Sequence, residues 1–196
     1  MRVPLPALLI LVILVLPLPA GARPADEPKA PGEALAAAVK AGDTAQVRAI
    51  IASGTPVDAP DWAGWSALNW AALLLETEIA TYLLDQGADL EHLAPGGRSS
   101  GRPLTLAAKK YRGAAMVRLL LERGAKVDGT DLLGRTGLMR AAEHGWLETV
   151  ELLLAHGADP NRATPGSKPQ TALILARDRG HPVVAQRLIA AGAKEK

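Results

Sequence analysis

The residues of this 196-residue chain that could do acid–base or metal chemistry are its four histidines, His92, His144, His156 and His181. His144 directly follows Glu143, and a carboxylate that orients an imidazole would create a general base. Neighbouring residues of a helix do not face each other, however, so this pair is not expected to make that contact. His156 stands beside a helix-ending glycine and His181 follows Gly180 in a turn, which gives both a structural explanation. We therefore expect solvated or structural histidines.

Motifs for catalysis or cofactor binding are absent from the sequence. It has no H-E-x-x-H metal motif, no G-x-S-x-G nucleophile turn and no glycine-rich loop followed by Lys-Ser/Thr. The segment APGGR at residues 94–98 has the glycines of a phosphate loop but lacks its flanking strand and lysine, so we expect the tip of a lengthened hairpin. The absence of cysteine removes thiol nucleophiles, thiolate metal ligands and disulfides. The sequence therefore predicts no catalytic residue, no cofactor, no metal site and no enzyme.

The elements that position these residues belong to a unit that recurs five times. In each unit a leucine is followed three residues later by alanine, and 19 or 20 residues after that leucine by a glycine. The leucines are Leu35, Leu68, Leu104, Leu138 and Leu173, and the glycines are Gly54, Gly87, Gly124, Gly157 and Gly192. A constant spacing inside units, with variation only between them, is typical of a repeat array.

Each unit predicts short amphipathic helices that need neighbours. In the segment GWLETVELLLAHGADPN, residues 145–161, Val150, Leu153 and Leu154 fall on one helix face, and Gly157 ends the helix through a left-handed residue. A helix of two or three turns is marginal in water by itself, so only stacking of one unit on the next can stabilise it. The expected N-caps of the first helices are Ser66, Thr136 and Thr171.

Two segments resemble the D-x-x-G-x-T-P-L opening of the ankyrin repeat family: DWAGWSAL at residues 61–68 and DLLGRTGL at residues 131–138. Gly145 and the Gly180-His181 pair resemble the turn between the two helices of that repeat, although the signature proline survives only as Pro103. The resemblance implies an all-α repeat solenoid, a single stacked domain of about five repeats, each with two helices and a β-hairpin or loop. The implied repeats span about residues 33–60, 61–93, 94–128, 129–162 and 163–193, followed by a tail at 194–196.

The N-terminus has the pattern of a secretory signal peptide. Arg2 precedes an unbroken apolar run at residues 7–16, and Ala20-Gly21-Ala22 offers a cleavage site of small residues. A retained membrane anchor is the alternative, but the apolar run is about 15 Å long as a helix, against about 30 Å of hydrocarbon. We expect cleavage after residue 22, a disordered linker at residues 23–32, and export, to the periplasm in a Gram-negative bacterium or otherwise to the medium.

Composition agrees with a thin stacked core. Hydrophobic residues make up 48% of the chain, but aromatic residues make up only 3% and phenylalanine is absent, so the core must be aliphatic. The formal net charge of +2 creates no general attraction to nucleic acid or to anionic membranes. We expect a monomer with no nucleic-acid partner and no stable membrane insertion.

Hairpin tips are the positions where the ankyrin resemblance implies partner contacts. They hold Trp62, Trp65, Leu132 and Leu133. Exposed tryptophan and leucine suit a binding hot spot, because they bury a large area and lose little side-chain entropy. The alternative is that these side chains fold back onto neighbouring hairpins. On the helices, Trp70 and Trp146 are expected to pack.

Charge is divided into two blocks of opposite sign. Residues 59–93 contain six acidic and no basic residues, whereas residues 94–128 contain eight basic and two acidic residues. The blocks can pair across the junction of two repeats, which we favour, or form a bipolar recognition surface. The full set of expected contact residues is Trp62, Trp65, Arg98, Arg102, Lys109, Lys110, Tyr111, Arg112, Leu132, Leu133, Arg135 and His144.

These features predict an exported, non-enzymatic interaction module that binds another protein through its hairpin tips and concave helix face. The alternative is an inhibitor or chaperone-like protector of an enzyme in the same compartment, which would use the same surface. Binding of a small ligand is disfavoured, because no segment marks a deep pocket with convergent polar groups.

Overall fold

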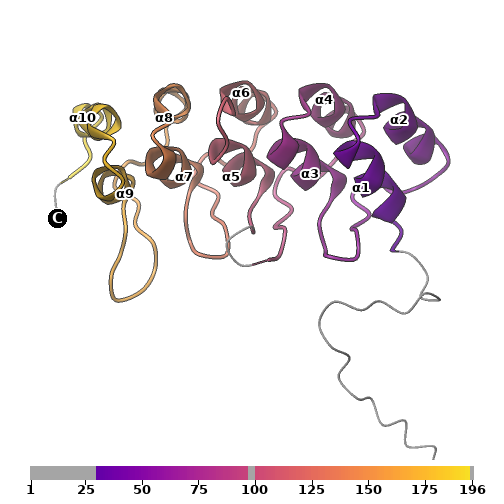
Figure 1. Ribbon diagram of the computed structural model, residues 1–196, viewed down its shortest axis with the longest axis horizontal. Coiled ribbons are helices and arrows are strands. Elements are labelled where there is room, and N and C mark those ends of the chain that lie inside the picture. The colour runs from indigo at the N-terminus through magenta and orange to yellow at the C-terminus, as the bar shows by residue number, and fades with distance from the viewer. Residues whose placement is uncertain (1–29, 97–99, 195–196) are drawn as a thin grey trace, which may run out of the picture.

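The computed structural model describes residues 30–96 and 100–194, which form ten α-helices arranged as five helix pairs (Figure 1). The helices are α1 Glu33–Lys40, α2 Thr44–Ala52, α3 Ala67–Leu74, α4 Thr77–Asp85, α5 Pro103–Ala108, α6 Ala114–Glu122, α7 Gly137–His144, α8 Leu147–Ala155, α9 Ala172–Asp178 and α10 Pro182–Ala190. Each pair lies within one of the five repeats expected from the sequence. The predicted all-α repeat solenoid is confirmed.

The helices lie in two rows. The odd-numbered helices form one row, in which α3 packs on α1, α5 on α3, α7 on α5 and α9 on α7, and the even-numbered helices form the other row (Figure 1). The core lies between the rows, where the alanine pairs of α3, α5 and α7 are fully buried. Leu83, Leu120 and Leu153 of the second row fill the same layer. Small side chains in one row let neighbouring repeats approach closely enough for these leucines to interlock.

Helix ends follow local rules. The hydroxyls of Ser66, Thr136 and Thr171 each accept a hydrogen bond from the backbone N–H three residues later, which confirms them as N-caps. The helix expected around residues 148–155 is α8, and Gly157 follows it with a φ of 85°. These local signals mark the starts of α3, α7 and α9 and the end of α8.

The segments that join one pair to the next extend to the same side of the odd-numbered row (Figure 1). Within the described ranges they form no strand, and the expected β-hairpins are reduced to single antiparallel bridges. These bridges join Ala94 to Gly101, Thr130 to Thr136 and Ala163 to Thr171. We call these segments the fingers.

Several expectations lie outside the described residues. They concern the signal peptide at residues 1–22, the linker from residue 23 to 29, Arg98 and the last two residues of the tail. Among the helices of residues 30–96 and 100–194, none has the length and apolar character needed to cross a membrane.

Candidate functional site

Two fingers are each shaped by one buried aspartate. Asp61 Oδ1 accepts hydrogen bonds from the backbone N–H groups of Ala63, at 2.9 Å, and Trp65, at 3.0 Å. Asp131 Oδ1 does the same for Leu133, at 2.8 Å, and Arg135, at 3.0 Å. Each aspartate closes a tight turn from inside, so the residue that follows it is presented at a fixed position.

The side chains after these aspartates are exposed. Trp62 is 70% exposed and Leu132 is 55% exposed, and Leu133 beside it is also exposed, as the sequence analysis predicted. These three residues form an apolar set on fingers two repeats apart.

The expectation that Trp65 is exposed is wrong. Only 6% of its surface is accessible, because its indole stacks on Trp70 with 4.5 Å between ring centroids. Its Nε1–H donates to the Pro95 carbonyl at 3.0 Å. Trp65 therefore folds back onto the next finger, and Trp70 packs as predicted.

The two charge blocks pair at two points across the junction of the second and third repeats. Arg102 Nε lies 3.0 Å from Glu91, and Arg123 Nη1 lies 2.9 Å from Asp85. The Arg102 guanidinium also donates to the Thr130 carbonyl. Arg102, an expected contact residue, is therefore held within the array.

The turn between α5 and α6 carries four of the expected contact residues. Lys109 and Lys110 are half-buried, whereas Tyr111 and Arg112 are exposed. The Tyr111 ring lies 5.2 Å from Trp146, and the Arg112 guanidinium lies 5.9 Å from the Tyr111 ring. Arg112 has a φ of 61°, a left-handed conformation that is unusual for a residue other than glycine.

Glu143, on α7, is the centre of a charged cluster. Its carboxylate accepts from Arg135 Nη1 at 2.7 Å, from Arg140 Nη1 at 3.4 Å and from Arg179 Nη2 at 3.1 Å. Burial by itself would raise the pKa of Glu143, but the charge and hydrogen bond of Arg135, with Arg140, lower it below its ordinary value. Glu143 therefore remains an anion that holds three guanidinium groups together.

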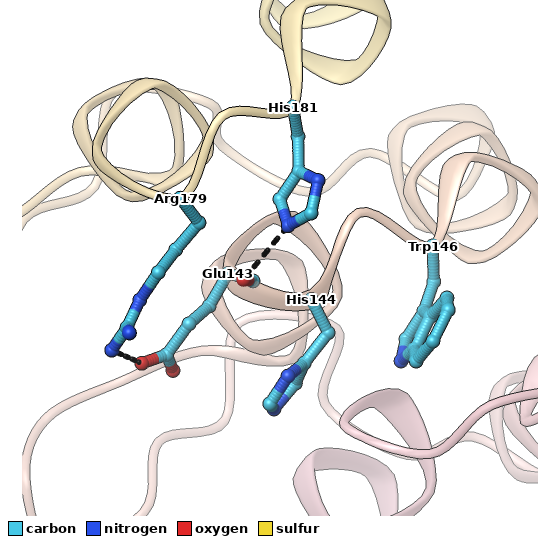
Figure 2. Close-up of a pocket in the computed structure, with 5 residues that line it drawn as sticks. All are labelled: Glu143, His144, Trp146, Arg179 and His181. Atoms are coloured by element: carbon cyan, nitrogen blue, oxygen red, sulfur yellow. Dashed lines mark hydrogen bonds and ion pairs between the residues drawn. The ribbon is translucent and has the colours of Figure 1, made fainter.

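Within the described residues, His144 forms no hydrogen bond with Glu143. Its ring lies 6.2 Å from that of Trp146, and in Figure 2 the Glu143 carboxylate is engaged by Arg179 instead. Partial desolvation lowers the pKa of His144 most, and Arg140 and Arg179 lower it further, against the opposing effect of Glu143. The exposed His144 ring therefore binds a proton less readily than an unperturbed imidazole.

The other histidines have structural contacts. Figure 2 marks the contact between the His181 ring and the Glu143 carbonyl, and His181 Nε2 lies 3.2 Å from that oxygen. His156 Nδ1 lies 2.8 Å from the Leu152 carbonyl. His92 Nε2 lies 3.0 Å from the Gly64 carbonyl of the preceding finger. In the part of the chain that the structure describes, no three His, Asp or Glu side chains gather closely enough to hold a metal ion.

Two adjoining cavities open around this cluster. The first, of about 360 Å³, is lined by Glu143, His144, Trp146, Arg179 and His181 (Figure 2). The second, of about 510 Å³, is lined by Lys109, Leu133, Arg135, Arg140, Glu143, His144 and Arg179. It brings together four residues named from the sequence, Lys109, Leu133, Arg135 and His144.

The sequence analysis missed Arg140 and Arg179, and it considered Glu143 only as a partner of His144. Arg140 had a detectable signal, because it stands two residues after the repeat leucine, where other units have Trp70, Leu106 and Leu175. A charge at a position that is otherwise apolar points to a paired buried ion. Its partner is Asp131, whose Oδ2 accepts from Arg140 Nε at 2.9 Å.

Comparison with known proteins gives a consistent result. Residues 104–196 match the family described as ankyrin repeats (3 copies). A putative ankyrin repeat protein of Escherichia coli (strain K12), YahD, is 30% identical, and the match covers 80% of this chain and 94% of that protein. A putative ankyrin repeat protein of Rickettsia bellii is 29% identical across 57% of this chain and 33% of its own length. Ankyrin repeat and KH domain-containing protein 1 of Homo sapiens is 43% identical across 46% of this chain, which spans only 4% of that much longer protein.

Proposed function

The chain belongs to the ankyrin repeat family, and we propose that it is an exported, non-enzymatic module that binds another protein through its fingers and the adjoining ends of α5, α7 and α9. Ankyrin repeats generally mediate protein–protein interaction, and proteins built from them are typically not enzymes. We call the proposed surface the contact face.

The observation that carries this proposal is the rigid display of apolar side chains. Trp62, Leu132 and Leu133 are exposed on turns that buried aspartates hold closed. Burial of exposed apolar groups against a partner lowers the free energy of the complex, because it removes them from water. Turns that are already fixed lose little conformational entropy on binding. A preformed partner surface can therefore dock with little rearrangement.

The test is affinity capture from the native compartment with matched double variants. Trp62→Ala/Leu132→Ala removes the exposed apolar side chains of two fingers. Val183→Ala/Ile189→Ala is the control, because both of those residues are exposed apolar residues of α10, outside the contact face. Trp65 is left intact, because truncating a buried tryptophan would cost about 3–5 kcal/mol of stability and obscure the result.

A partner captured by the wild type and the control, but lost from the finger variant, supports the proposal. Equal capture by all three would remove the fingers from the contact face, and no reproducible partner would contradict the interaction function itself. Adding the purified protein to an activity assay of the captured partner then separates an adaptor from the alternative, an inhibitor or protector.

Export is proposed from the N-terminal pattern. A cleaved leader predicts that the protein isolated from its organism begins at Arg23. N-terminal sequencing of that protein, with fractionation of the cells, tests the site of cleavage and the compartment. An intact Met1 on protein in the cytoplasmic fraction would contradict export.

A further inference from the structure

Lys109 differs from the other basic residues that line the 510 Å³ cavity. Each arginine of the lining is paired: Arg135 and Arg179 bind Glu143, and Arg140 binds both Glu143 and Asp131. The Lys109 ammonium forms no hydrogen bond or ion pair with any residue in 30–96 or 100–194, although the side chain is half-buried. A half-buried cation that has no hydrogen bond or ion pair is costly, and such an ammonium can bind an anionic ligand.

The cavity carries a surplus of positive charge. Lys109 and three arginines line it, against Glu143 as its one acidic lining residue and Asp131 behind Arg140. Burial lowers the pKa of Lys109, and the charges of Arg140 and Lys110 lower it further, against the weaker opposing effect of Asp131. Burial also lowers the pKa of His144, and Arg140 and Arg179 lower it further against the opposing effect of Glu143. Burial is the main cause of both shifts, and the neighbouring cations add to them. An added anion would offset the part that is due to those cations.

We propose that this cavity receives a carboxylate side chain from an acidic segment of the partner protein, with Lys109 as the contact that binds it. The inference rests on the proposed function and specifies the chemistry of the partner. Guanidinium groups already fixed by Glu143 provide further donors without reorganisation, and charged hydrogen bonds to carboxylates are stronger than neutral ones.

The walls of the cavity favour a peptide segment over a free small anion. Leu133 lines the cavity and is exposed, and Leu132 stands next to it on the same finger. Trp146 lines the adjoining 360 Å³ cavity, and its ring lies against Tyr111, which is exposed. Apolar residues that flank an acidic side chain would be buried on these walls, whereas a free anion would use only the charges.

The experiment measures fluorescence anisotropy of two labelled peptides on the purified full chain. One peptide alternates glutamate and leucine, and the other has glutamine in place of every glutamate. Lys109→Met removes the proposed contact, and Lys126→Met removes the same charge from an exposed lysine that does not line the cavity. Lys109→Arg restores a cation at the same position.

We expect the glutamate peptide to bind the wild type at least tenfold more tightly than the glutamine peptide does. Lys109→Met should weaken that binding at least tenfold, whereas Lys109→Arg and Lys126→Met should remain within about threefold of the wild type. Thermal denaturation controls for folding, and Lys109→Met should be no less stable than the wild type, because it removes a poorly solvated charge.

Four results would overturn the inference, three from the peptide titrations and one from competition with phosphate. The first is unchanged binding in Lys109→Met, the second is an equal loss in Lys126→Met, and the third is failure of the glutamate peptide to bind. Displacement of the peptide by inorganic phosphate at concentrations near the peptide's own Kd would make the cavity a small-anion site instead. None of these outcomes affects the capture experiment, so the proposed function and this inference can fail separately.

Discussion

Glu143 shows how a single residue can organise a surface built from several repeats. Its carboxylate binds Arg135 from a finger, Arg140 from its own helix and Arg179 from the end of α9. It is only 8% exposed, and the Arg140 side chain is equally buried, so the ion pair with Arg140 is the best shielded from water and from salt. The Arg179 side chain is 59% exposed, so its ion pair is the least shielded. Glu143 therefore stabilises the fold and shapes the cavity that the arginines line.

At the scale of this single residue, we expect acid to lower the free energy of unfolding by protonating Glu143. Its pKa in the folded chain lies below its ordinary value of 4.5, so the folded state binds a proton less readily than the unfolded state. Its contribution to stability is therefore present above that ordinary value and is lost as the pH falls through the folded pKa. Glu143→Gln should lower the free energy of unfolding by roughly 1–3 kcal/mol at pH 7 and flatten its fall between pH 5 and pH 3.

Urea denaturation at a series of pH values measures this effect. Glu122→Gln is the control, because Glu122 is exposed and has no ion pair within the described residues. If the stability of the wild type changed as little between pH 5 and pH 3 as that of Glu143→Gln, the charged cluster around Glu143 would not contribute to the pH dependence of stability.

The turn between α7 and α8 requires a glycine at position 145. Gly145 has a φ of 75°, and a Cβ atom there would lie 2.5 Å from Nδ1 of His181 in the next repeat. The same histidine ring contacts the Glu143 carbonyl, so it cannot move without losing that bond. Gly157 has a similar φ of 85°, but a Cβ atom there would meet no atom within 4 Å.

Alanine at these two glycines should therefore have unequal effects. Gly157→Ala should cost about 1 kcal/mol of stability, which is the strain of a left-handed residue. Gly145→Ala should cost at least about 1 kcal/mol more, because it adds a clash with the neighbouring repeat. Thermal or chemical denaturation of the two variants measures the difference in stability. Equal losses of stability would contradict the prediction, because they would show that the His181 ring moves aside with no loss of free energy.

At the scale of the whole molecule, the array holds together through contacts between neighbouring repeats. Within the described residues, α1 and α2 pack on the second pair alone, and α9 and α10 pack on the fourth pair alone. The central pairs have neighbours on both sides. Val47 is the one buried residue of α2, whereas α6 in the centre buries four.

We therefore expect stability to be graded along the array. Hydrogen exchange should be slowest for backbone amides of α5 to α8 and faster in α1, α2 and α10, because each repeat is stabilised mainly by its neighbours. Mass spectrometry of exchanged peptides measures this gradient. Uniform protection from α1 to α10 would indicate one cooperative unit and contradict the prediction.

Most of the fold could be predicted from the sequence, because its signals are local. The glycines after the second helices and the caps at Ser66, Thr136 and Thr171 act within one turn of backbone, and their spacing revealed the repeat and its family. The candidate site was predicted less completely. Lys109, Leu133, Arg135 and His144 were named, but nothing in the spacing joined them to Arg140, Glu143 and Arg179.

The sequence by itself determined the helix pairs and their number in the described chain, because these depend on nearest neighbours along the chain. It left open which of the finger residues Trp62 and Trp65 is exposed. Only the tertiary structure decided that Trp65 is buried against Trp70 and the next finger. It also decided that side chains from residues 135, 140 and 179 converge on Glu143. The physical reason is that burial and ion pairing depend on how one repeat stacks on the next, and that geometry is shared by residues far apart in sequence.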